Sequence, residues 1–139
     1  MALSRRELLV LGGSACAATM LGCGSLLPSM LDAGMASALA VGALRAVSGY
    51  PVAVGHDAGG YYAISLICTH AGCDMGVDGQ VSSAGVLCSC HGSVFDVNGA
   101  VMRGPAGTGL DHYAVSIDAG GKLIVHGDQM VSATTRTAA

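Results

Sequence analysis

The chain has 139 residues, a formal net charge of -3 and only 11% charged residues, with no cluster of Lys and Arg. This composition provides no electrostatic footprint for nucleic acid and excludes nucleic-acid binding. The length allows one domain, and with one Phe and no Trp its core is expected to be small. A small domain usually gains stability from a disulfide or a metal, so we expect the six cysteines to be structural as well as functional.

The first segment, residues 1–27, places Arg5 and Arg6 before a run of twenty uncharged residues. It resembles a twin-arginine export signal, in which Ser4 and Leu8 match the polar position before the pair and the apolar position after it. The alternative interpretation is an ordinary secretory signal or a short membrane anchor.

Three fates of this segment are compatible with the sequence. Twenty apolar residues are long enough to remain as a membrane anchor, although four glycines weaken the span. The sequence MLGC, ending at Cys23, resembles a lipoprotein signal box and would tether the domain through a lipid. Cleavage after Ala38, in the small-residue sequence ASA, would release a soluble protein. Residues 28–39, which are rich in Ser, Ala, Gly and Met, are predicted to form a flexible linker.

Residues 40–128 show short β-type runs separated by glycine turns. Pairs of runs flank three turns: 50–56 and 61–67 flank DAGG, 93–97 and 100–103 flank NG, and 110–118 and 122–127 flank AGG. No window after residue 45 has a helical apolar period of useful length. The sequence therefore predicts an all-β domain of stacked antiparallel hairpins, followed by a polar and disordered tail over 129–139.

Two loops contain most of the residues that could bind a metal, CTHAGC at 68–73 and CSCHGS at 88–93. Each loop follows a predicted strand, so we expect both to project from one end of the sheet. Their four cysteines and two histidines are too many for one tetrahedral zinc, but would suit a two-iron cluster with four ligands and one remaining disulfide. A structural zinc site and two plain disulfides are the alternatives. The other histidines lack partners at ligand spacing and are expected on the surface or in packing: His56, His112 and His126.

These two loops closely resemble the two boxes of Rieske [2Fe-2S] proteins, and the resemblance extends from the strands before Cys68 to the end of the globular part. It implies a fold of stacked antiparallel sheets with the cluster-binding loops at one end, and one [2Fe-2S] cluster per chain. In that family Cys68 and Cys88 would bind one iron. The other iron would be bound by the imidazole nitrogens of His70 and His91.

The resemblance also implies a disulfide between Cys73 and Cys90, as in Rieske proteins of respiratory and photosynthetic membranes. Oxygenase-type Rieske domains of the cytoplasm lack this bond. Because disulfides persist in exported proteins, the pair and the arginine signal support one another. We therefore expect export by the twin-arginine route to the periplasm or the outer face of the cytoplasmic membrane, with the domain tethered there.

Four further positions correspond to residues that surround the cluster in that family. Ser93 matches the serine whose hydroxyl bonds a bridging sulfide and raises the reduction potential. Phe95 stands where high-potential members have a tyrosine that bonds a ligand sulfur, so we expect a lower potential than theirs. Gly104 and Pro105 resemble the start of the proline loop that covers the cluster, and Gly107 replaces its usual second proline.

The resemblance implies a membrane-tethered electron-transfer subunit that passes electrons from a quinol, or another reduced centre, to a cytochrome. Its expected partners are a quinol-oxidising cytochrome b-type subunit and a cytochrome acceptor, and it would have no complete active site of its own. The first alternative is the Rieske small subunit of an exported molybdenum oxidoreductase such as arsenite oxidase. A soluble ferredoxin-like donor to an oxygenase and a structural zinc module are the others.

Overall fold

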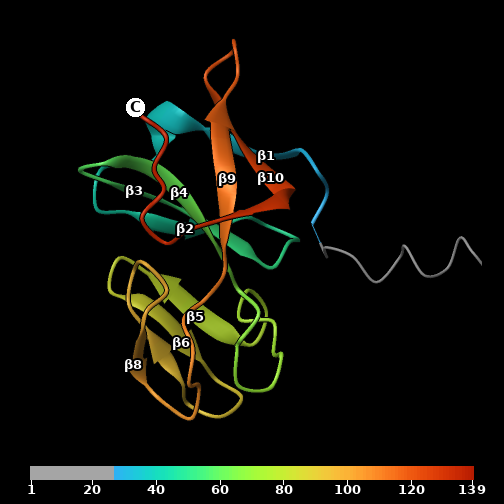
Figure 1. Cartoon of the computed structure of the whole chain (residues 1–139), viewed down its shortest axis with the longest axis vertical. Coiled ribbons are helices and arrows are strands. Elements are labelled where there is room, and N and C mark those ends of the chain that lie inside the picture. The colour runs from blue at the N-terminus through green and yellow to red at the C-terminus, as the bar shows by residue number, and fades with distance from the viewer. Residues whose placement is uncertain (1–26) are drawn as a thin grey trace, which may run out of the picture.

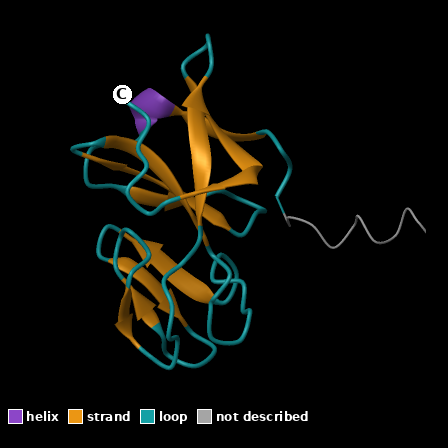
Figure 2. Ribbon diagram, viewed as in Figure 1, coloured by secondary structure: helices purple, strands orange, loops and turns teal. Residues whose placement is uncertain are grey.

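Two antiparallel sheets make up the part of the chain that the computed structural model describes, residues 27–139 (Figure 1). Strands and loops dominate this part, and its one helical element is the short 3-10 helix η2 (Ala36–Ala38) (Figure 2). None of its helices has the length and apolar character needed to cross a bilayer. The predicted all-β fold is confirmed, whereas the arginine pair and Cys23 lie outside the described residues.

The larger sheet has six strands in the order β1-β10-β9-β4-β3-β2. These are β1 (Leu31–Met35), β10 (Lys122–Val131), β9 (His112–Ile117), β4 (Gly60–Ser65), β3 (Val52–Asp57) and β2 (Leu44–Ala46). The Arg45 guanidinium on β2 donates a hydrogen bond of 2.6 Å to the Ala33 carbonyl on β1. This bond joins the two edge strands, so the sheet is curled and presents less open edge to solvent.

The smaller sheet has four strands in the order β5-β6-β7-β8 and is built from the chain between β4 and β9. It comprises β5 (Gly79–Ser82), β6 (Gly85–Cys88), β7 (Val94–Phe95) and β8 (Val101–Arg103). The three predicted hairpins form as expected, as β3 with β4, β7 with β8, and β9 with β10. Local turn chemistry was sufficient to predict them.

The two cysteine loops come from different sheets, so the expectation that they project from one sheet is wrong. The first loop follows β4 of the six-stranded sheet, and the second follows β6 of the four-stranded sheet. The reason is that β5 to β8 pair only among themselves, while β4 pairs with β3 and β9. The loops are therefore brought together by the tertiary fold and not by pairing of the strands that they follow.

The structure differs from the flexible linker predicted for residues 28–39. Within this segment β1 pairs with β10, with Leu31 opposite Val125. Leu31 and Ala33 are buried, because alternate side chains of the strand point into the core. Leu27 is also buried, so the ordered domain includes this segment.

The structure also differs from the disordered tail predicted for residues 129–139. Strand β10 continues to Val131, and the backbone of Thr137 then exchanges two hydrogen bonds with Tyr61, at 2.8 and 2.9 Å. A Cβ atom at Gly60 would collide with the Thr137 carbonyl, so the absence of a side chain there permits this approach. The polar composition of the segment did not reveal these long-range contacts.

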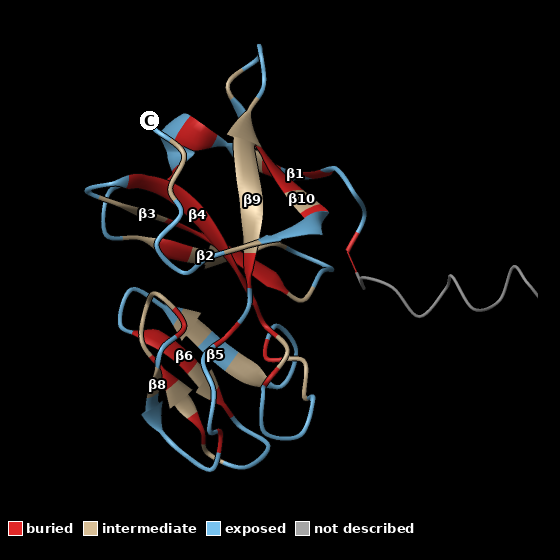
Figure 3. Cartoon of the chain, viewed as in Figure 1, coloured by how far each residue is buried: buried red, intermediate tan, exposed pale blue. Residues whose placement is uncertain are grey.

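Buried residues form two clusters (Figure 3). One lies within the six-stranded sheet and includes Val54, Leu123 and Val125. The other joins the two sheets, because it includes Ile64 of β4 and Phe95 of β7. Removal of this apolar surface from water stabilises the position of one sheet relative to the other.

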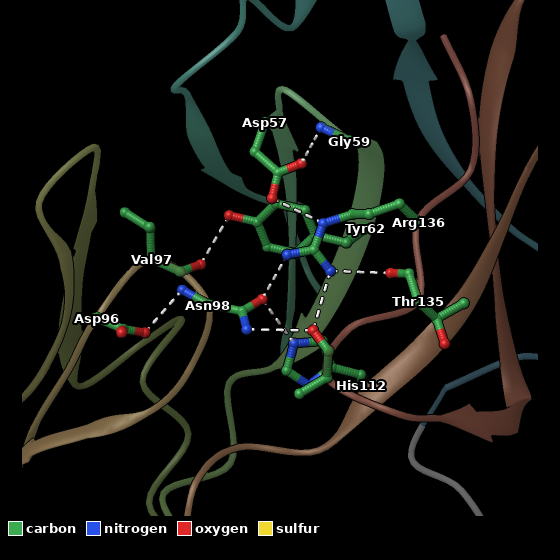
Figure 4. A network of polar contacts seen from close by, with 10 residues as sticks. Asp57, Gly59, Tyr62, Asp96, Val97, Asn98, His112, Thr135 and Arg136 are labelled. Atoms are coloured by element: carbon green, nitrogen blue, oxygen red, sulfur yellow. Dashed lines mark hydrogen bonds and ion pairs between the residues drawn. The ribbon is translucent and has the colours of Figure 1, made fainter.

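A polar network also connects the C-terminal segment with both sheets (Figure 4). Arg136 donates to the carboxylate of Asp57 at 2.7 Å and to the side-chain oxygen of Asn98 at 2.8 Å. Its guanidinium lies 4.2 Å from the centre of the Tyr62 ring, and the Tyr62 hydroxyl donates to the Val97 carbonyl at 2.8 Å. Asp57 and Tyr62 belong to the larger sheet, and residues 97 and 98 follow β7 of the smaller one. Arg136 therefore links the two sheets.

Candidate metal centre

The first cysteine loop folds back on itself directly after the larger sheet. The Cys68 N–H donates to the Cys73 carbonyl at 2.8 Å, and the Gly72 N–H donates to the Cys68 carbonyl at 2.8 Å. Gly72 has φ +76°, a left-handed conformation that favours glycine and allows the tight turn. Cys68 is consequently buried, and His70 lies exposed at the tip of the loop.

The second loop repeats this backbone pattern. The Cys88 N–H donates to the Ser93 carbonyl at 2.8 Å, and the Gly92 N–H donates to the Cys88 carbonyl at 2.9 Å. Gly92 also has a positive φ, +84°. Cys88 is buried at the end of β6, and His91 is exposed at the tip. Each loop thus has one buried thiol and one exposed imidazole.

The structure brings the two histidines together. The ring centres of His70 and His91 lie 4.7 Å apart, with the ring planes at 82° to each other. The thiols of Cys68 and Cys88 are free and buried. Two thiols on the inner side and two imidazoles on the solvent side are the donor types that a mixed cysteine and histidine iron site requires. The donor chemistry of the loops therefore fits a two-iron cluster.

A disulfide joins the two loops. It links Cys73 of the first loop to Cys90 of the second, with 6.7 Å between their Cα atoms. The pairing expected from the resemblance is confirmed. The bond connects loops that come from different sheets, so it holds the two halves of the site at a fixed separation.

Three sulfur atoms gather on one side of the site. The sulfurs of Cys73, Cys88 and Cys90 all lie within 4.8 Å of one another. They do not form a metal site in this state, because the disulfided pair Cys73 and Cys90 has no thiolate to offer. Cys88 remains available as a ligand, together with Cys68.

A third loop, residues 104–110, closes over the second cysteine loop. The Ala106 N–H donates to the Ser93 hydroxyl oxygen at 3.0 Å, and both residues are buried. Gly104 and Pro105, joined by a cis peptide bond, precede Ala106 and are exposed. The predicted proline loop therefore lies against Ser93, and the Ser93 oxygen receives a bond that fixes its position.

Two contacts of the cysteine loops were missed in the sequence. The Thr69 hydroxyl donates to the Thr108 carbonyl at 2.7 Å, between the tip of the first loop and the third loop. The Arg103 guanidinium donates to the Gly92 carbonyl at 3.2 Å. Thr69 lies between the predicted ligands Cys68 and His70, and this position was the only sequence feature that pointed to it. These bonds join residues 39 and 11 positions apart, so sequence spacing does not reveal them.

Phe95 lies on β7 with no exposed surface, within the buried cluster that also contains Cys68 and Cys88. A phenyl ring carries no hydrogen-bond donor, so no side-chain hydroxyl is offered to a sulfur from this position.

The remaining histidines contact other parts of the chain: His56 Nδ1 lies 2.7 Å from the Leu39 carbonyl oxygen, and His126 Nε2 lies 2.7 Å from the Ser116 hydroxyl oxygen. His112 is buried and its Nε2 lies 3.2 Å from the side-chain oxygen of Asn98, within the network of Figure 4. Burial lowers the pKa of His112 below the ordinary value of 6.5, against the opposing hydrogen bond to the Leu110 carbonyl. Burial tends to raise the pKa of Asp57, but hydrogen bonds from Arg136 and other donors outweigh it and hold this pKa below its ordinary value.

Comparison with known proteins identifies the family of the domain. The family model of the Rieske [2Fe-2S] domain matches residues 33–114. The cytochrome b6-f complex iron-sulfur subunit of Synechococcus sp. (strain WH7803) is 41% identical over 69 residues, which cover 50% of this chain and 38% of that protein. The corresponding subunit of Prochlorococcus marinus (strain MIT 9303) is 44% identical over 57 residues, covering 41% of this chain and 31% of that protein.

Two solved structures resemble the described part of the chain. The cyanobacterial plasma membrane Rieske protein from Synechocystis PCC 6803 is 28% identical with a TM-score of 0.53, covering 68% of this chain and 97% of that one. The Sphingomonas yanoikuyae B1 ferredoxin is 25% identical with a TM-score of 0.50, covering 70% and 97%. The matched regions span less than two fifths of the length of the curated relatives, but nearly all of these two structures.

Proposed function

This chain belongs to the Rieske [2Fe-2S] domain family, and from that we propose that it transfers electrons through a cluster held between its two cysteine loops. The observation that carries the proposal is the pairing of two free, buried thiols with two exposed imidazoles. A chain with this arrangement can exchange electrons with a partner at its surface, because the histidines lie at the loop tips.

The proposed ligands are Cys68 and Cys88 for one iron, and His70 and His91 for the other. When bound, a cluster with two neutral imidazoles in place of two thiolates accepts an electron at a higher potential than an all-cysteine cluster. The chain contributes a dry environment for the thiols, since Cys68 is 3% exposed and Cys88 is fully buried. The histidine rings are exposed, so they lie where a redox partner could approach them.

Ser93 and the third loop complete the surroundings. The N–H of Ala106 bonds to the Ser93 oxygen, which leaves the hydroxyl proton of Ser93 available as a donor. Donation to a cluster sulfide stabilises the reduced state and raises the potential. Ala106, which follows Gly104 and Pro105, is buried against Ser93, so the Ser93 hydroxyl is shielded from water.

The proposed partners are a quinol, or another reduced centre, as donor and a cytochrome as acceptor, with a cytochrome b-type subunit beside the domain. The curated relatives support this, because they are named as iron-sulfur subunits of the cytochrome b6-f complex. The disulfide Cys73–Cys90 supports the further proposal of export to the periplasm or the outer face of the cytoplasmic membrane. The proposals of twin-arginine export and of a membrane tether are based on the sequence of residues 1–27.

One observation favours a second candidate, the small subunit of an exported molybdenum oxidoreductase such as arsenite oxidase. The buried Phe95 offers no hydroxyl to a ligand sulfur, so the potential is expected below that of quinol-oxidising high-potential members. Purification from membranes under mild conditions distinguishes the candidates. A cytochrome b that copurifies supports the first, and a molybdenum subunit supports the second.

Low-temperature electron paramagnetic resonance tests the central proposal. The spectrum is recorded before and after dithionite reduction, with iron and zinc quantified in the same sample. We expect a rhombic signal in the reduced state only, with an average g below the free-electron value, and two irons per chain. A silent spectrum with one zinc per chain would refute electron transfer and identify the loops as a structural zinc module.

A further inference from the structure

We propose that Cys88 attacks the neighbouring Cys73–Cys90 disulfide whenever no iron holds it, so that the cluster must be inserted before this disulfide forms. The exchange itself depends only on the three sulfurs. The order of assembly rests on the proposed function, in which Cys88 is an iron ligand.

The geometry places a free thiol beside a disulfide. The Cys88 sulfur lies within 4.8 Å of both sulfurs of the Cys73–Cys90 bond. Cys68, the other free cysteine within residues 27–139, is not a member of this group. A short movement of the second loop would bring the Cys88 sulfur into contact with one of its neighbours, because Cys88 and Cys90 share that loop.

The reaction is balanced without an external oxidant. The Cys88 thiolate forms a bond to the Cys73 sulfur while the bond between Cys73 and Cys90 breaks, and the electron pair leaves with the Cys90 sulfur. One disulfide is consumed and one is formed. The proton lost from Cys88 is taken up by the Cys90 thiolate or by solvent.

The alternative attack on Cys90 is disfavoured. It would join Cys88 to Cys90 across the single residue Ser89, and such a small ring departs from the preferred torsion of a disulfide. The product with Cys73 instead connects the same two loops as the original bond. We therefore expect the exchanged chain to carry Cys73–Cys88 and a free Cys90.

The exchange changes which thiol faces solvent. Before it, the free thiols are Cys68 and Cys88, which are 3% and 0% exposed. After it, the free thiol of the second loop is Cys90, an exposed position. The exchanged chain has also lost Cys88 as a ligand, so it cannot take up the cluster. Iron bound to Cys88 removes the attacking group and preserves the original disulfide.

The test uses the full chain with Cys16→Ser and Cys23→Ser, so that only the four cysteines of the loops remain. Iron-free and iron-loaded samples are incubated under nitrogen, and aliquots are treated with iodoacetamide without denaturant. Remaining thiols are then blocked in denaturant, and disulfides are mapped by peptic digestion and mass spectrometry. In the iron-free chain we expect Cys73–Cys88 peptides and at least about tenfold more alkylation of Cys90 than in the loaded chain, since Cys90 is an exposed free thiol after exchange but stays in a disulfide in the loaded chain.

Two matched variants serve as controls. Iron-free Cys88→Ser should keep only the Cys73–Cys90 bond, with Cys90 unlabelled, whereas iron-free Cys68→Ser should exchange as the parent does. An iron-free parent that keeps only Cys73–Cys90 overturns the proposal. Alkylation of Cys68 at the same rate as Cys90 also counts against it, because it indicates unfolding. Exchange is measured in the iron-free chain, so failure of this proposal is distinguishable from failure of the electron paramagnetic resonance test of the proposed function. Equally fast exchange in the loaded chain would show that Cys88 is not an iron ligand.

Discussion

At the scale of single residues, Phe95 is the position where this chain departs from the high-potential members that its loops resemble. Its ring is fully buried in the same cluster as the two free cysteines. No side-chain donor is present there, although the two boxes that precede it match the family pattern. The potential is therefore expected to depend on Ser93 without assistance from residue 95.

Phe95→Tyr should raise the reduction potential of the loaded chain. A hydroxyl that donates to a ligand sulfur stabilises the reduced cluster, and about 1 kcal/mol corresponds to about 40 mV for one electron. Redox titration monitored by circular dichroism gives the midpoint. Phe95→Leu, which adds no donor, is the control, and an unchanged or lower midpoint for Phe95→Tyr would refute the role assigned to this position.

At the scale of elements, the C-terminal segment contributes more than its composition suggests. Arg136 is bonded to Asp57 and Asn98, and its side chain is 16% exposed. Lys122 forms the other ion pair of the described residues, with Asp32, and both of these side chains are 48% exposed. The two pairs have almost the same length, 2.7 and 2.6 Å, and differ mainly in burial.

Arg136→Ala should lower the free energy of unfolding by about 2 kcal/mol, because it removes partly buried, charge-assisted bonds and leaves Asp57 without its cation. Lys122→Ala should cost less than about 1 kcal/mol, since exposed ion pairs contribute little. Urea denaturation of both variants measures the difference. Equal losses would mean that Arg136 does not link the sheets.

His112 at the start of β9 should make stability depend on pH. Burial lowers its pKa in the folded chain below 6.5, so the unfolded chain binds a proton more readily. Its contribution is fully present above about pH 6.5 and is lost as the pH falls through the folded value.

His112→Gln should show a smaller loss of stability than the wild type between pH 8 and about pH 5, because it removes this titrating group. The measurement is urea denaturation across that range, with both proteins in the same cluster state. Parallel curves for the two proteins would assign the pH dependence to other groups.

At the scale of the whole molecule, the site exists because two sheets meet. Cys68 follows a strand of the larger sheet and Cys88 ends a strand of the smaller one. Three connections hold this junction, which are the shared buried cluster, the Arg136 network and the Cys73–Cys90 bond. Since β1 and Leu27 belong to the ordered domain, residues 28–39 do not provide a pivot for movement of the domain.

Removing the disulfide should weaken the whole junction. The double variant Cys73→Ala, Cys90→Ala should unfold with a free energy lower by about 3 kcal/mol, as expected for a bond across 17 residues. It should also lose the cluster to a chelator faster than the wild type, because the loops can separate. Denaturation and the decay of visible absorbance measure the two effects, and unchanged values of both would show that the other connections suffice.

Much of the fold and the site was predictable from local sequence. The turns at 57–60, 98–99 and 119–121 predicted three hairpins, because glycine and asparagine favour tight turns regardless of what surrounds them. The two boxes indicated the family and the pairing of Cys73 with Cys90, both of which are confirmed. The four cluster ligands remain a prediction, consistent with free thiols at Cys68 and Cys88.

The sequence by itself determined the all-β class, the hairpins and the chemical character of the two loops, because each depends on residues close together in the chain. Only the tertiary structure decided that the loops come from different sheets, that residues 31–35 form a strand, and that Arg136 joins the sheets. Each of these depends on contacts between segments far apart in sequence. Such contacts are selected by burial and backbone pairing in the complete fold, which spacing and composition do not encode.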